Sequence, residues 1–139
     1  MNLSAARHLV ETSLERMQAL YSQPVFDEWV ILTPSGKHSG VLAYAGPRLE
    51  EFRKKLPSDV EPLLAQLAGR NLAIGDFEFT QEGDGTRHDA LIRLGATSYL
   101  VCNNLAHSMA EIRKDARWLK AQAAFVDLCE KFRTDPLEA

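Results

Sequence analysis

The chain has 139 residues, of which 45% are hydrophobic and 25% are charged, and its formal net charge is -3 at pH 7. These values match an average globular domain, and the length suits one domain with its own hydrophobic core. The slightly acidic balance argues against a protein that binds the phosphate backbone of nucleic acids. No stretch reaches the roughly 20 apolar residues of a membrane-spanning helix, and Arg7, Glu11, Glu15 and Arg16 interrupt any apolar run that could form a signal peptide. We therefore expect a cytoplasmic protein without a membrane or nucleic-acid partner.

The first half of the chain predicts a helix, a β-hairpin and a second helix. Apolar residues recur every three or four positions over residues 4–21, which is the spacing of an amphipathic helix. Residues 25–33 and 38–45 are rich in β-branched and aromatic side chains, and the Pro-Ser-Gly-Lys sequence between them is typical of a turn. A second helix is predicted over residues 47–69, with an interruption at Pro57.

The second half predicts three strands and a long helix. The strands cover residues 72–80, 87–94 and 97–103, and their short glycine-containing connections favour an antiparallel meander. The last helix is predicted over residues 105–132 and carries two apolar seams, which would press it against a sheet and leave a flank that could hold a partner. The first seam consists of Ile112, Ala116, Leu119, Ala123 and Val126, and the second of Trp118, Phe125, Cys129 and Phe132. Residues 1–132 are thus expected to form one domain, followed by a flexible tail at 133–139.

No motif for catalysis, phosphate binding or zinc binding is present in the sequence. Asp76 and Glu78 alternate on a predicted strand and, with His88 and Asp89 on the next strand, have the residue types of a cation site. Charges on a solvent-facing edge are the more common reason for such a pattern. Cys102 and Cys129 lie among apolar residues, which indicates buried free thiols. We therefore assign no catalytic residue, metal or cofactor.

The order helix, two strands, helix, three strands, helix resembles the roadblock / dynein light chain family of the profilin-like architecture. The sequence Glu-Trp-Val-Ile-Leu-Thr-Pro-Ser-Gly-Lys at 28–37 is similar to that family's first strand and turn, and residues 38–45 to its second strand. The resemblance implies an α+β fold of order αββαβββα, in which a five-stranded antiparallel sheet has helices on both faces. The second helix would cover one face, and the first and third helices the other.

Members of that family are non-enzymatic platforms that bind Ras-like GTPases or serve as subunits of motor and signalling complexes. They typically form homodimers by pairing their third strands and packing their second helices together. The resemblance therefore implies a homodimeric adaptor or regulatory platform for a small Ras-like GTPase or signalling complex, with no cofactor. The implied dimer contact would consist of Leu63, Leu67, Leu72, Ile74 and Phe77.

Two other interpretations stay open. A PAS-like or profilin-like sensor would enclose a small ligand in a cavity, which here would be lined by Trp29, Tyr44 and Tyr99. A secretion-chaperone-like dimer would place three strands before the second helix, whereas two are predicted here. An enzyme is the least supported class, because no nucleophile or acid–base pair can be assigned.

Overall fold

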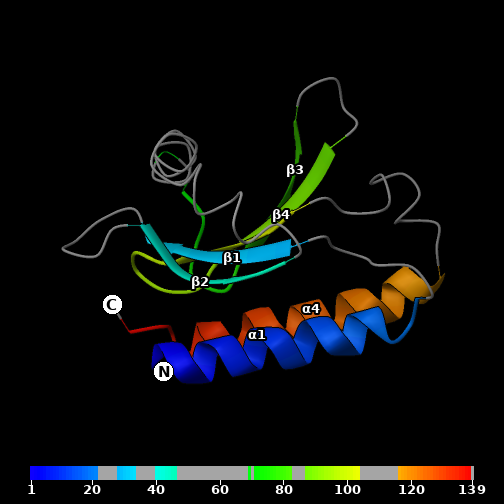
Figure 1. The fold of residues 1–139 in the computed structure, drawn as a ribbon, viewed down its shortest axis with the longest axis horizontal. Coiled ribbons are helices and arrows are strands. Elements are labelled where there is room, and N and C mark those ends of the chain that lie inside the picture. Colours follow the sequence, from blue (N-terminus) through cyan, green and yellow to red (C-terminus); the bar gives the residue numbers. More distant parts are fainter. Residues whose placement is uncertain are drawn as a thin grey trace.

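The described residues form a five-stranded sheet with two helices on one of its faces (Figure 1). The computed structural model describes residues 1–21, 28–33, 40–46, 69, 71–82, 87–103 and 116–138. The predicted hairpin turn at 34–37, residues 47–68 of the predicted second helix and the predicted helix start at 105–115 lie outside these ranges. The elements are, in chain order, α1 (Leu3–Gln18), β1 (Glu28–Thr33), β2 (Gly40–Ala45), β3 (Phe77–Glu82), β4 (Arg87–Arg93), β5 (Tyr99–Asn103) and α4 (Ala116–Thr134).

The sheet has the strand order β2-β1-β5-β4-β3, and every neighbouring pair is antiparallel. This arrangement confirms the predicted α+β class, the hairpin of β1 and β2, and the meander of β3, β4 and β5. The hairpin joins the meander through β1 and β5, with Val30 opposite Val101. All six residues of β1 are buried because this strand lies inside the sheet, whereas β2 and β3 form its two edges.

The alternation of side chains along the strands divides the core into two clusters. On the face that carries α1 and α4, Trp29 and Ile31 of β1 join the larger cluster. On the opposite face, Val30 and Leu32 belong to a second cluster with Leu91, Tyr99 and Val101. Both faces of the sheet therefore carry buried apolar side chains.

Helices α1 and α4 lie side by side in one layer against the sheet (Figure 1). The N-terminus of α1 is capped by Asn2, whose Oδ1 accepts a hydrogen bond of 2.9 Å from the backbone N–H of Ala5. One stripe of α1 is buried at Ala6, Val10 and Met17, which matches the predicted amphipathic helix.

The two predicted seams of the last helix have different surroundings. Phe125, Cys129 and Phe132 of the second seam are buried in the larger cluster. In contrast, the described members of the first seam are exposed, namely Ala116, Leu119, Ala123 and Val126. The first seam, which has the more regular spacing of three and four residues, therefore faces away from the core.

The segment after α4 packs against the start of the chain and the β4–β5 connection. Helix α4 ends at Thr134, two residues later than predicted. The backbone N–H of Leu137 donates to the carbonyl oxygen of Leu94 at 2.9 Å, and the Leu137 side chain is buried. The N–H of Glu138 donates to the carbonyl oxygen of Met1 at 2.8 Å. The flexibility that the sequence predicts for 133–139 stays a prediction. It can be tested at the amides of Leu137 and Glu138, which donate these two hydrogen bonds.

Candidate protein-binding edge of the sheet

Strand β3 is an edge strand, as the sequence resemblance implies for the third strand. It pairs with β4 along its whole length, from Phe77 opposite Ile92 to Glu82 opposite Arg87. No other described strand pairs with its second side. The outward N–H and C=O groups of an edge strand can pair with another chain.

The segment that leads into β3 is a turn, whereas the sequence predicts a strand from residue 72. Gly75 has a φ of 84°, in the left-handed region that glycine adopts readily. Its N–H donates to the carbonyl oxygen of Arg93 at 2.8 Å, and the N–H of Asp76 donates to the carbonyl oxygen of Ala73 at 3.0 Å. Because this turn interrupts the extended backbone, β3 begins only at Phe77.

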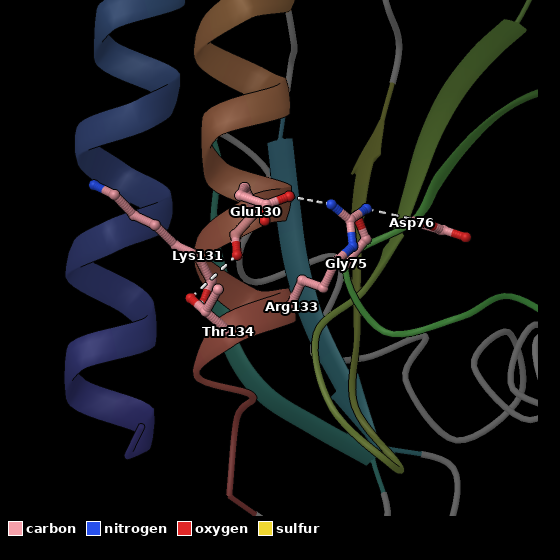
Figure 2. Close-up of polar contacts among 6 residues, drawn as sticks. All are labelled: Gly75, Asp76, Glu130, Lys131, Arg133 and Thr134. Carbon is pink, nitrogen blue, oxygen red and sulfur yellow. Dashed lines mark hydrogen bonds and ion pairs between the residues drawn. The ribbon is translucent and has the colours of Figure 1, made fainter.

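Arg133 of α4 holds this turn from the helix side (Figure 2). Its Nη2 lies 3.0 Å from the carbonyl oxygen of Gly75 and 3.0 Å from Oδ1 of Asp76, while Nη1 pairs with the carboxylate of Glu130. The hydrogen bond to Asp76 raises the pKa of the Arg133 guanidinium, which therefore stays charged at neutral pH. The two chain segments also approach closely, because a Cβ atom on Gly75 would lie 2.7 Å from Cβ of Arg133.

Arg93 of β4 holds the same segment from the sheet side. Its Nη1 donates to the carbonyl oxygen of Leu72 at 2.7 Å, and its Nε and Nη2 donate to Gly95 and Ala96 at 3.1 and 2.9 Å. Arg93 thus links the segment before β3, residues 72–76, which we call the lead-in, to the β4–β5 connection. Since Arg133 binds the opposite end of the turn, the lead-in is fixed from two directions.

The three predicted contact residues that the structure describes do not share one surface. The Phe77 ring packs inward at 5.2 Å from the ring of Phe125, with an interplanar angle of 88°. Leu72 packs against the second cluster on the other face of the sheet, and Ile74 lies half-buried in the turn. Leu63 and Leu67 lie outside the described residues. Contact of these five residues with a second chain stays a prediction.

The single cavity predicted for a ligand sensor does not form from its three aromatic residues. Trp29 faces α1 and α4, whereas Tyr44 and Tyr99 pack on the opposite face of the sheet. The reason is the strand register, since Tyr99 lies opposite Leu32 and Tyr44 opposite Val30, and both of these alternate with Trp29 along β1. Trp29 lines a separate cleft of about 400 Å³ between α1 and the hairpin, together with Glu11, Leu14, Glu15, Gln18, Glu28, Ala45 and Gly46.

The two thiols have the environment that the sequence predicts. Cys102 and Cys129 are both buried and free. Burial raises the pKa of the Cys129 thiol to about 12, so it stays protonated and unreactive at neutral pH. Within the described residues, no group of three or more histidine, cysteine or carboxylate side chains has a metal-binding arrangement, and no helix is long and apolar enough to cross a membrane.

Comparison with known proteins gives matches among solved structures. No protein-family model matches the chain, and no curated protein matches its sequence. A structure described as MglB with tetrameric arrangement matches at 16% identity and a TM-score of 0.42, over 93% of this chain and 90% of the other. The gliding protein MglB from Thermus thermophilus matches at 16% identity and a TM-score of 0.41, over 91% of this chain and 93% of the other. Both matches cover more than 90% of this chain at low sequence identity, and they show a likeness of fold.

Proposed function

We propose that this chain is a non-enzymatic, cytoplasmic adaptor or regulatory platform that acts as a homodimer and binds a small Ras-like GTPase or a component of a signalling complex. The observation that carries the proposal is the edge position of β3 together with its doubly anchored lead-in. Arg93 and Arg133 fix the backbone at residues 72–76 from two sides. A partner strand would then meet an edge that is already ordered, which lowers the entropic cost of association.

The charges at the start of β3 are compatible with pairing between two copies. Two like charges opposite each other in an antiparallel pair repel, and Asp76 lies just before the strand. In this structure Arg133 supplies a positive charge 3.0 Å from that carboxylate. The ion pair is half-exposed and therefore adds little stability of its own, but it offsets the negative charge that Asp76 would bring to a pair of β3 strands.

A GTPase partner follows from the family resemblance of the sequence. A platform that binds one conformation of a GTPase shifts the GTPase toward that conformation, and it needs no catalytic residue for this. The buried, protonated thiol of Cys129 and the absence of a catalytic motif from the sequence support a binding role over a chemical one.

The first test is the mass of the full chain in solution, measured by light scattering across a concentration series. At the lowest concentrations of the series, where the weaker contact proposed below does not contribute, we expect a dimer for the native chain and a monomer for Ile74→Lys, with an unchanged circular dichroism spectrum. Ala73→Lys is the matched control, because Ala73 is exposed in the same turn and only its carbonyl oxygen is used. A native chain that stays monomeric at every concentration would overturn the homodimer.

The GTPase part has its own test. A purified Ras-like GTPase from the same genome, loaded with GDP or with a non-hydrolysable GTP analogue, is titrated with the chain. We expect binding that depends on the nucleotide. No binding in either state would overturn the GTPase assignment and leave the homodimer standing.

A further inference from the structure

The outer surface of α4 carries an apolar seam that no described element covers. Leu119 is 63% exposed and Val126 is 45% exposed, and the other large hydrophobic side chains that the structure describes are all more covered than these two. Ala123 lies between them on the same face, since residues three and four apart are neighbours on a helix. We call Leu119, Ala123 and Val126 the outer seam. It lies on the side of α4 opposite the buried Phe125 and Phe132, and α4 itself lies in the helix layer on one face of the sheet (Figure 1).

One flank of the outer seam carries two opposite charges. Lys120 and Asp127 are seven residues apart and therefore lie two turns apart along the same flank. Both are exposed. The carboxylate of Asp127 lies 3.8 Å from the guanidinium of Arg16 on α1, and both side chains are more than half exposed, so this pair is weak and easily rearranged.

The order of these charges makes the surface complementary to itself. When two identical helices pack antiparallel across a two-fold axis, each flank meets the same flank of its partner. With the axis between Ala123 and Ala124, Lys120 of each copy lies opposite Asp127 of the other copy, which forms two ion pairs. Leu119 then lies within about a turn of Val126 of the second copy, and the small Ala123 side chains at the crossing allow close approach.

We propose that the outer seam of α4 binds α4 of a second copy of this chain in an antiparallel arrangement. An unrelated protein could bind the outer seam with apolar side chains and charges of its own. Only pairing with a second copy requires the charges of this surface to be complementary to themselves in the antiparallel arrangement. The surface is separate from the β3 edge, so this contact does not depend on the homodimer proposed above. Because the seam spans only about two turns, we expect association that grows with concentration rather than a permanent complex.

The test is a charge exchange across the proposed axis, made in the Ile74→Lys background so that pairing through β3 does not contribute. Lys120→Asp and Asp127→Lys each place like charges opposite each other twice, and each should weaken self-association about tenfold or more. Mixing the two single variants restores complementarity, so the mixture should associate although neither variant does alone. The double variant should self-associate like the parent chain.

The readout is sedimentation equilibrium of the full chain across a concentration series. Arg7→Asp is the matched control for Lys120→Asp, because it makes the same change of net charge at an exposed position on α1 and should leave association unchanged. The proposal is overturned if the mixture of single variants fails to associate, or if Leu119→Asp self-associates as strongly as the parent. These outcomes are independent of the β3 homodimer, which is measured separately in a chain that has native Ile74 and carries Lys120→Asp.

Discussion

Replacing Gly75 with alanine should destabilise the protein by about 2–4 kcal/mol. Roughly 1–2 kcal/mol comes from holding a residue with a Cβ atom in the left-handed region at a φ of 84°. A similar amount comes from packing, because the added Cβ would lie 2.7 Å from Cβ of Arg133 and 2.8 Å from the carbonyl oxygen of Cys129. Neither atom can rotate away, since one is main chain and the other is bonded directly to it. The turn and α4 must therefore move apart.

That movement would weaken the contacts that position the start of β3. Arg133 spans the same gap with two hydrogen bonds of 3.0 Å, to Gly75 and Asp76, and both would lengthen (Figure 2). For a chain of this size the expected loss corresponds to a decrease of roughly 6–16 °C in the melting temperature. The assay is thermal and urea-induced unfolding, followed by circular dichroism.

Gly75→Asn separates the two contributions. Asparagine tolerates the left-handed region better than alanine but carries the same Cβ atom. It should therefore recover part of the stability lost to the backbone conformation, and none of the stability lost to the close contacts of the Cβ atom. The reasoning would be refuted if Gly75→Ala unfolded within about 0.5 kcal/mol of the native chain, the range of an ordinary surface substitution.

Two further predictions concern the thiol of Cys129 and the segment after α4. Unfolded, the thiol loses its proton above about pH 8.5, whereas in the native state its pKa is about 12. The native state therefore binds one more proton in this range, and its stability should fall with rising pH. Between pH 8.5 and 10 the native chain should lose about 1.5 kcal/mol more than Cys129→Ala in urea-induced unfolding, and parallel pH profiles would contradict this. Gly95→Ala should release the terminal segment, because the added Cβ would lie 2.5 Å from the carbonyl oxygen of Leu137. Hydrogen exchange should then be faster at the Leu137 amide, which bonds to Leu94 in the native chain, while the amides of β5 stay protected. A Leu137 amide that exchanges at the rate of an unstructured peptide in the native chain would instead support the flexible tail predicted from sequence.

The sequence predicts the strands because their composition and their turns agree. β1, β4 and β5 lie within three residues of their predicted limits, and the glycine-containing connections correctly indicate antiparallel neighbours. The start of β3 could not be predicted in the same way. Leu72 and Ile74 are typical strand residues, and the turn that replaces the strand depends on Arg93 and Arg133, which are distant in sequence.

The orientation of α4 also depends on tertiary structure. Two seams are visible in the sequence, and the first has the more regular spacing of three and four residues. The structure buries the second, because its phenylalanines fill the space beside the sheet, as the contact between Phe125 and Phe77 shows. Periodicity identifies an apolar face, but the volumes of the side chains opposite it decide which face is buried.

The β3 edge and the outer seam of α4 lie on different parts of the molecule, and the two proposed contacts together restrict the assemblies that this chain can form. Each contact is isologous, so each contains a two-fold axis that relates two copies. If the two axes cross at right angles, the contacts close into a tetramer with dihedral symmetry. If they do not meet, the same contacts extend into an open polymer. Ile74→Lys should leave only α4 pairs, and Lys120→Asp only β3 pairs, so both variants should stop at dimers. A chain that carries both substitutions should be a monomer, and larger species from that double variant would show that a third surface is involved.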